Sequence, residues 1–322
     1  MKKLLSLVLT LCMLMACFTF ASAEDKVYQI GILQLVKHDA LDAATQGFMD
    51  VLTEKLGADK VVFELQNAQG DMQTCTTIAT SFANNGKDLI MANATPALQA
   101  CMSATSSIPV LGTSVTDYAV ALGDASMDLS AGTGINVSGV SDGVDAHLYA
   151  QLVKDLVPEA KKVSIVYCSA EPNSVVQSDN FIAAMAEIDP EAVCSVYMFN
   201  DTNDMQQTVQ TAVEDCDALY IPTDNTAASN MTIVRNVCEP AKVPVLCGEE
   251  NMTKVGGLAT VSISYYDIGK LAGEMAYEIL VGGADIAAMP IAYSANPVKK
   301  YSASYAEAIG FTMPEDYEAI AE

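Results

Sequence analysis

The fold is indicated by two stretches with one pattern, DLIMANAT at residues 88–95 and DALYIPTD at residues 217–224. Each runs from an aspartate through a short β-prone apolar core to polar residues that can begin a helix. Further along, IPVLG at residues 108–112 is matched by VPVLC at residues 243–247. The offset stays near roughly 130 residues, about the length of one domain. The sequence therefore predicts one α/β half written twice.

Both halves alternate short β-rich runs with amphipathic segments. The predicted strands cover residues 27–35, 61–65, 89–93, 108–111, 163–167, 193–199, 218–221 and 243–246. The predicted helices cover residues 41–56, 71–82, 96–102, 175–188, 204–213 and 227–237. Such alternation is typical of βαβ units and of parallel sheets covered on both faces. We expect an α/β protein of two similar Rossmann-like lobes with a ligand cleft between them.

The remaining elements require the chain to cross back between the lobes. A polar stretch with two glycines at residues 136–143 suits a hinge. A strand at residues 260–263, a helix at residues 266–280 and a strand-like piece at residues 290–295 then follow the second half. We expect a leader at residues 1–23, an N-terminal lobe at 24–140 with about 264–286, and a C-terminal lobe at 141–263 with about 287–322.

The composition excludes several kinds of partner. The 322 residues carry 16 Lys plus Arg against 40 Asp plus Glu, a formal net charge of −24, while 51% of residues are hydrophobic. The chain is too apolar to be a disordered acidic polymer. Binding nucleic acid requires clustered cations, and Arg235 is the single arginine of the chain. A basic patch for anionic lipid is absent for the same reason.

The first 23 residues have the pattern of an export signal. Lys2 and Lys3 precede an apolar run from Leu4 to Phe20, and small residues lead up to Ala23. We expect cleavage after Ala23 and a mature protein outside the cytoplasm, extracellular or periplasmic. The alternatives are an uncleaved anchor helix, or cleavage before Cys17, where LMAC at residues 14–17 resembles a lipobox and would carry a lipid.

The sequence contains no clear motif for metal binding or for catalysis. No pair of the nine cysteines shows the CxxC spacing of a zinc knuckle or a thioredoxin, and no GxSxG, Walker A or GxGxxG motif occurs. His38 and His147 are the only histidines. His38 lies four residues before Asp42, but two weak ligands do not make a metal site. We expect no cofactor, no metal and no enzymatic activity.

Polar loops follow the predicted strands, where ligands of open parallel sheets bind. Thr95 and Pro96 are predicted to begin a helix as a hydroxyl cap followed by proline at the first helical position. The loop TDNT at residues 223–226 is its counterpart in the other half. Two such helix starts facing each other would frame a shared cleft.

The scarcity of arginine also limits the charge that a ligand of this protein can carry. A site for phosphorylated ligands would need several cations. Here a ligand carboxylate would be held by N–H groups and hydroxyls, and a ligand amine by acidic residues at the strand ends. Those acidic residues are Glu171, Asp224, Glu249 and Glu250. This pattern favours a small zwitterion or a neutral polyol over a polyanion.

At these loops the sequence resembles one known family: the solute-binding proteins of ABC transporters in the TrpX-like branch, with the periplasmic binding protein type I fold. The resemblance spans nearly the whole mature chain. It is carried by ILQ at 32–34, HDALD at 38–42, ATP at 94–96, VTD at 115–117, GVSD at 139–142, EPNS at 171–174, PTDNT at 222–226 and SYYDIG at 264–269. The chain departs from the family's common pattern at residues 168–170 and 246–250, which bears on the substrate's side chain more than on the fold.

The resemblance implies two lobes joined by three crossovers that close on an aromatic amino acid or a related small molecule. It implies an ABC permease and ATPase as partners. Eight residues match family positions that face the cleft: Gln34, Thr95, Ser114, Glu171, Asn173, Ser174, Asp224 and Asn225. From the neighbouring loop residues we add His38, Pro96, Thr223 and Glu249 to the expected ligand-binding set.

We therefore expect an exported, non-enzymatic solute-binding protein of an ABC importer, in contact with the membrane only through its permease or through a lipid on Cys17. The alternatives are a binder of sugars or nucleosides, a ligand-sensing adaptor of the same fold, and a two-domain α/β enzyme.

Overall fold

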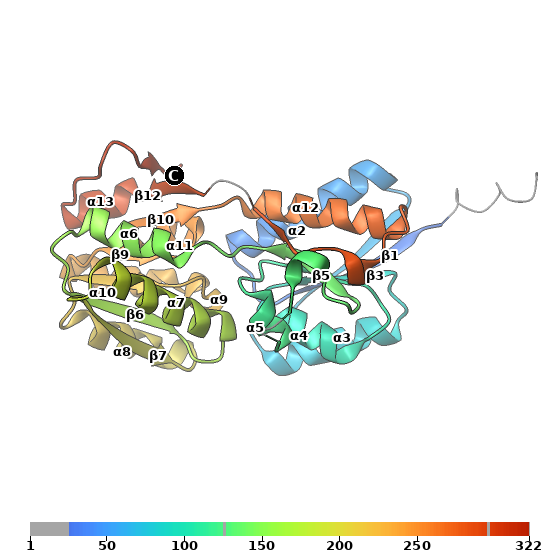
Figure 1. Ribbon diagram of the computed structural model, residues 1–322, viewed down its shortest axis with the longest axis horizontal. Helices are drawn as coiled ribbons and strands as arrows, with labels where there is room; N and C mark the ends of the chain where they lie inside the picture. The colour runs from blue at the N-terminus through green and yellow to red at the C-terminus, as the bar shows by residue number, and fades with distance from the viewer. Residues whose placement is uncertain (1–25, 125–126, 295–296, 322) are drawn as a thin grey trace, which may run out of the picture.

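Two parallel sheets with helices on both faces make up the computed structural model of the chain, which describes residues 26–124, 127–294 and 297–321 (Figure 1). The leader, the cleavage site and Cys17 lie outside the described residues. No helix in the described part is long and apolar enough to cross a membrane.

The first lobe is built on a six-stranded sheet in which every pairing is parallel. From edge to edge, its strands are β11 (Ala292–Tyr293), β5 (Val137–Ser141), β4 (Val110–Thr113), β3 (Leu89–Asn93), β1 (Tyr28–Gln34) and β2 (Val61–Asn67). Its helices are α2 (Asp39–Leu56), α3 (Met72–Asn84), α4 (Thr95–Ala104), α5 (Tyr118–Leu122) and α12 (Tyr265–Leu280), with 3₁₀ turns at Leu129–Ala131 and Ile286–Ala288.

The second lobe repeats this arrangement in a seven-stranded sheet. Its strand order is β13 (Glu318–Ala319), β12 (Val298–Tyr301), β10 (Ala259–Ser262), β9 (Val245–Cys247), β8 (Ala218–Ile221), β6 (Lys162–Cys168) and β7 (Val193–Phe199), with only β12 antiparallel to β10. Its helices are α6 (Ala146–Leu156), α7 (Pro172–Ile188), α8 (Thr202–Val213), α9 (Asn225–Ala228), α10 (Met231–Ala241), α11 (Glu250–Gly256) and α13 (Ala303–Ile309).

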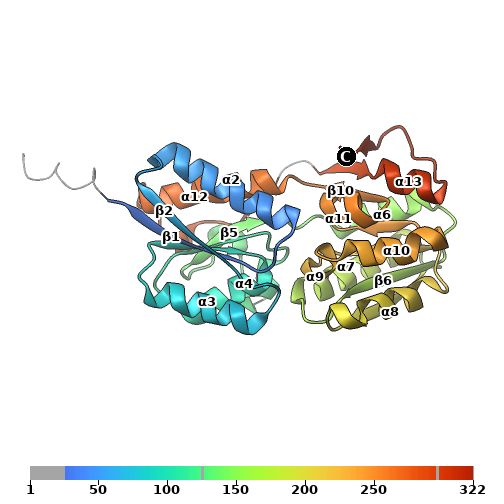
Figure 2. The ribbon, with the colours of Figure 1, turned by 180° about the vertical axis from the view of Figure 1, so that it is seen from behind.

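The internal repeat predicted from the sequence is confirmed by the strand orders. The two quoted stretches become β3 and β8, and the two following ones become β4 and β9. The order β5-β4-β3-β1-β2 of one sheet matches β10-β9-β8-β6-β7 of the other. In both lobes, the carboxyl ends of the strands face the neighbouring lobe, as the views from front and back show (Figures 1 and 2).

Three chain segments link the lobes, after β5, after β10 and after β11. β11 pairs in parallel with β5 in the first sheet, through Ala292 opposite Val140. This pairing extends the first lobe to Tyr293, beyond the boundary that the sequence placed near residue 286. A two-residue edge strand lacks the length from which a sequence pattern could assign it to either sheet.

Helices form where the apolar spacing and the caps agree. In α2 the buried Leu41, Ala44, Phe48 and Leu52 recur at helical spacing. Asp71 caps α3 by accepting a hydrogen bond from the N–H of Thr74 at 2.7 Å, as the sequence predicts.

Two expectations about helices are wrong. Thr95 is not a cap but the first residue of α4, because the chain turns one residue earlier, at Ala94 with φ 93°. The helix expected at residues 227–237 is split into α9 and α10. The split falls at Ser229 and Asn230, whose side chains bond back to carbonyls of the preceding turn and compete with the helix.

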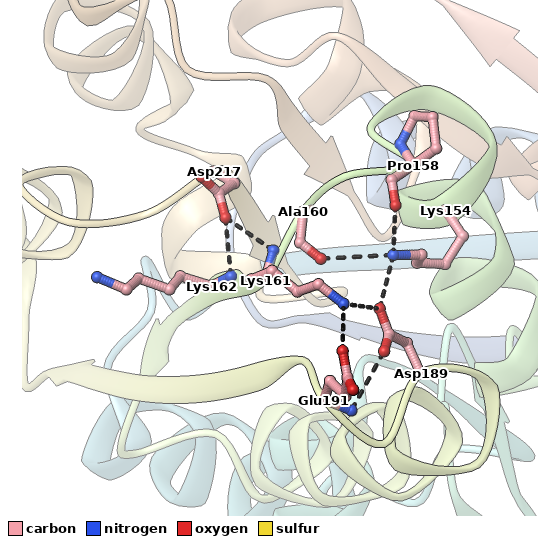
Figure 3. A network of polar contacts seen from close by, with 8 residues as sticks. All are labelled: Lys154, Pro158, Ala160, Lys161, Lys162, Asp189, Glu191 and Asp217. Carbon is pink, nitrogen blue, oxygen red and sulfur yellow. Dashed lines mark hydrogen bonds and ion pairs between the residues drawn. The ribbon is translucent and has the colours of Figure 1, made fainter.

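A network of ion pairs lies at the edge of the second lobe where β6, β7 and β8 begin, which is the edge away from the cleft (Figure 3). Asp189 accepts hydrogen bonds from Lys154 at 2.8 Å and Lys161 at 3.4 Å. Asp217 accepts from the backbone N–H groups of Lys161 and Lys162. The network therefore ties together the turns that precede three neighbouring strands.

Candidate ligand-binding site

A cavity of about 240 Å³ lies between the carboxyl ends of the two sheets. The first lobe contributes mainly apolar groups, from Leu35 and Val36 after β1, Met72 in α3 and Pro96 in α4. The second lobe contributes polar groups after β6, β7 and β8, together with Cys168 and Ala170. These polar residues are Glu171, Asn200, Asp201, Thr202, Asn225, Thr226, Ser229 and Asn230. The cavity falls below the range of drug-sized pockets, roughly 300–1,000 Å³, and suits a small ligand with one apolar and one polar side.

The first turn of α4 lacks a side-chain cap. The backbone carbonyl of Ala94, the residue before the helix, accepts from the N–H of Leu98, but the Ala94 side chain has no acceptor, so among the described residues no side-chain cap meets the first N–H groups of the helix. These N–H groups and the helix dipole favour an anion. Ser114 follows the next strand, β4, with φ 54°, and its hydroxyl is buried without a partner in the described chain. A strained residue next to an uncapped helix is a pattern found at binding sites.

Two buried carboxylates stand on the opposite wall, in the second lobe. Glu171 accepts four hydrogen bonds at 2.7–2.9 Å, from the backbone and side-chain groups of Asn225 and Thr226. Asp224 accepts three at 2.8 Å, from the N–H groups of Cys168 and Ala227 and from the Ser174 hydroxyl. A carboxylate can accept about four hydrogen bonds, so Glu171 is saturated and Asp224 has one site left.

Burial raises the pKa of Asp224 to about 8, and the negative charge of Glu171 adds to this rise. No lysine or arginine pairs with either carboxylate in the part of the chain that the structure describes. A ligand cation would therefore be stabilised here, because it would supply the positive charge that these residues lack.

Two side-chain hydrogen bonds between described residues cross the cleft. His38 Nε2 lies 3.2 Å from Asn225 Oδ1, and Gln177 Nε2 donates to Thr116 Oγ1 at 3.4 Å. Burial lowers the pKa of His38, although Asn225 and Glu171 act in the opposite direction. The lobes are thus in direct contact on both sides of the cleft.

The twelve residues expected to bind ligand divide into three groups. Pro96, Glu171 and Asn225 line the cavity. Thr95, Ser114, Asn173, Ser174, Thr223 and Asp224 lie at the strand ends beside it, and the Asn173 side-chain oxygen is a second buried acceptor without a partner.

The third group consists of Gln34, Glu249 and His38, whose side chains form hydrogen bonds with other residues of the protein. Gln34 bonds inside the first lobe to Val36, Asp42 and Thr45. Glu249 caps α11, and burial raises its pKa to about 7. His38 contacts Asn225 across the cleft.

The apolar wall of the cavity was not predicted from the sequence. Leu35, Val36 and Met72 line the cavity although they look like ordinary core or helix residues. The loop after β7, from Asn200 to Thr202, was also missed. The signal was present, since this loop follows a predicted strand like the other polar loops.

The described residues contain no group of three or more His, Cys, Asp or Glu that could hold a metal ion. All seven described cysteines are free. Cys168 lines the cavity, but burial raises the pKa of its thiol to about 11, so it is protonated at neutral pH and a poor nucleophile.

Two parallel-sheet lobes, joined by three segments around a small cleft, define a two-lobed ligand-binding protein of the periplasmic binding protein type I fold. The sequence matches the family of ABC transporter substrate binding proteins over residues 29–320. The chain belongs to this family.

Three proteins illustrate how similar this chain is to other solute-binding proteins in sequence and structure. The chain is 36% identical to a tyrosine-binding protein of Clostridioides difficile over 297 residues, covering 87% of this chain and 85% of the relative. It superposes with a TM-score of 0.85 on an ABC domain from Streptococcus pneumonia in complex with L-Trp, at 31% identity over 92% of this chain and 100% of that one. A ligand-free, open substrate-binding protein with adhesive properties from Clostridium difficile gives 0.68, at 35% identity over 91% of this chain and 99% of the other.

The superpositions on the L-Trp complex and on the open protein differ in quality. The sequence is slightly closer to the open protein, yet the superposition on it is worse. In this structure the hydrogen bonds from His38 and Gln177 hold the two lobes together.

Proposed function

We propose that this protein binds an aromatic L-amino acid between its lobes and presents it to an ABC importer. The division of the cleft carries the proposal: an uncapped helix start with a buried, unpartnered hydroxyl lies on one wall, and buried carboxylates without a cation lie on the other. Such a division matches the two charges of an amino acid. The tyrosine-binding relative and the L-Trp complex support an aromatic side chain.

In the proposed complex the ligand carboxylate lies at the start of α4, near Ser114. The ammonium group lies on the other wall, near Asp224 and the free side-chain oxygen of Asn173. The aromatic ring occupies the cavity beside Leu35, Met72 and Pro96. Asp224 is better suited than Glu171 to take the ammonium group, because only Asp224 has an acceptor site left.

We infer that the mature chain works outside the cytoplasm, after removal of residues 1–23, and docks on the permease of its transporter. Release after Ala23 is preferred to a lipid on Cys17, because PheThrPhe at residues 18–20 continues the apolar run. We further infer that each lobe moves as one unit, residues 26–141 with 265–293 against residues 144–262 with 298–321.

Isothermal titration of the purified mature protein tests this function. L-tyrosine, L-tryptophan and L-phenylalanine should bind, and their D-enantiomers, L-leucine, nucleosides and sugars should bind far more weakly. Tight binding of a sugar or nucleoside without binding of any amino acid would replace the proposed ligand class.

A further inference from the structure

The two hydrogen bonds across the cleft share one design. In each, a carboxamide of the second lobe is oriented by its own lobe and presents its remaining polar atom to the first lobe. Asn225 donates through Nδ2 to Glu171 at 2.7 Å, which leaves Oδ1 for His38. Gln177 accepts through Oε1 from the Thr223 N–H at 3.1 Å, which leaves Nε2 for Thr116.

This orientation determines the state of His38. Because Asn225 must point its N–H₂ at the Glu171 carboxylate, its oxygen faces the imidazole. His38 Nε2 must therefore carry the proton, and Nδ1 is left bare, buried and without a partner. His38 precedes α2 but does not cap it with its side chain, so the ring is free to reach across the cleft.

The contacts lie at opposite ends of the cleft. His38 follows β1, near the outer side of the first sheet, whereas Thr116 follows β4, next to the strand that leads into the first crossover. Neither His38 nor Thr116 lines the 240 Å³ cavity. Thr116 and Gln177 instead border a separate small hollow of about 80 Å³ near the hinge. Each hydrogen bond joins one lobe to the other, so a separation of the lobes would break both.

We propose that His38–Asn225 and Thr116–Gln177 are two closing latches that set the affinity of the protein without reading the ligand. The inference rests on the proposed function, since it concerns the closure around that ligand. Apparent affinity falls with the fraction of protein that can reach the closed state, so a contact made only on closure strengthens binding of every ligand equally. Losing one net hydrogen bond should weaken binding by about 3- to 10-fold.

The test uses His38→Phe, which keeps a ring but removes the hydrogen bond, and Thr116→Val, which keeps the shape but removes the acceptor. His147→Phe is the matched control, since His147 is exposed on α6, away from the cleft. Each latch variant should bind tyrosine, tryptophan and phenylalanine about 3- to 10-fold more weakly, with unchanged ratios among the three. The control should bind like the wild type.

Small-angle X-ray scattering of the ligand-free proteins gives a second readout. The His38→Phe protein should show a larger radius of gyration than the wild type, and the double variant should be larger still. Unchanged affinities in the latch variants would overturn the inference. A change of more than about 3-fold in the affinity ratios among the three ligands would also overturn it, because His38 or Thr116 would then contact the ligand.

Failure of the proposed function is distinguishable from failure of the latches. If the wild-type protein binds no aromatic amino acid, the proposed ligand class is wrong. Small-angle scattering of the ligand-free proteins would then be the only test of the latches. Equal radii for the wild-type and His38→Phe proteins would overturn the inference in that case.

Discussion

Single residues account for the chemistry of the cleft. The carboxylates of Glu171 and Asp224 are both buried, and Asp224 accepts one hydrogen bond fewer than Glu171. A sequence reading can place both at strand ends, but it cannot count their donors. The pairing of His38 with Asn225 was also unpredictable, because 187 residues separate the two and only lobe closure joins them.

Ser114→Ala should weaken binding of an aromatic amino acid by about 10- to 100-fold. A hydrogen bond to a charged group contributes about 1.5–3 kcal/mol, and the Ser114 hydroxyl has no other partner. The stability of the ligand-free protein should change little. Ser178→Ala is the control, because it removes another buried serine hydroxyl, on α7, and calorimetry should find its affinity unchanged. Equal affinities for both variants would remove Ser114 from the site.

Affinity should rise with pH from 6 to about 8 and then level off. An ammonium group binds the ionised carboxylate of Asp224, and below a pKa of about 8 the proton must first leave that group. Acidification therefore opposes binding. The lowered pKa of His38 in the closed protein acts in the same direction, because an open, hydrated His38 takes up a proton more readily.

Asp224→Asn should weaken binding by about 2–5 kcal/mol, the cost of removing one partner of a buried charge pair, and should flatten the rise of affinity below pH 8. Titrations at four pH values measure both effects. The thermal midpoint of the variant serves as control, since Asp224 also caps α9. A folded variant with wild-type affinity would reject Asp224 as the ammonium partner.

Helices and strands account for the rigidity of each lobe. α2 and α12 come from opposite ends of the sequence and lie side by side on one face of the first sheet (Figures 1 and 2). Gly47 of α2 and Gly269 of α12 allow this approach, since a Cβ on either would collide with the backbone of the other helix. The sequence predicts both helices from their spacing, but it does not show that they touch.

Gly269→Val should lower the thermal midpoint strongly or prevent folding, because its side chain would collide with the Ala44 carbonyl. Lys270→Ala, at the next position, changes an exposed residue and should leave the midpoint within a degree or two. Differential scanning calorimetry compares the two. A Gly269→Val protein as stable as the wild type would show that α12 does not pack this closely.

Asp189→Ala should destabilise the second lobe without affecting the cleft. The variant loses the hydrogen bonds to Lys154 and Lys161, and the Lys154 partner is largely shielded from solvent (Figure 3). We expect a lower free energy of unfolding, because two lysines lose the carboxylate that accepts their hydrogen bonds. Chemical denaturation measures it, and affinity for tyrosine should be unchanged. A fall in affinity would mean that the network acts on the cleft.

For the whole molecule, the internal repeat allowed the fold to be predicted from the sequence. Two matching stretches predicted two sheets of one topology, and the observed strand orders agree. The cavity itself was less predictable. Its polar wall could be expected from the strand-end loops, but Leu35 and Met72 line the cavity only through the way in which the two lobes meet.

The two departures from the family pattern have different positions in the structure. Cys168 and Ala170 line the cavity, whereas Glu249 is engaged as a cap of α11. If the proposed function holds, the first departure would bear directly on which ligand side chain the cavity accepts, whereas the second lies at the cap of α11.

The central claim is that the cleft holds an aromatic L-amino acid. Native mass spectrometry of the protein as purified, followed by denaturation and identification of the released small molecule, tests it most directly. We expect L-tyrosine, L-tryptophan or L-phenylalanine, bound one to one and at lower occupancy in the Ser114→Ala protein. Release of a sugar, a nucleoside or a non-aromatic compound as the bound species would contradict it.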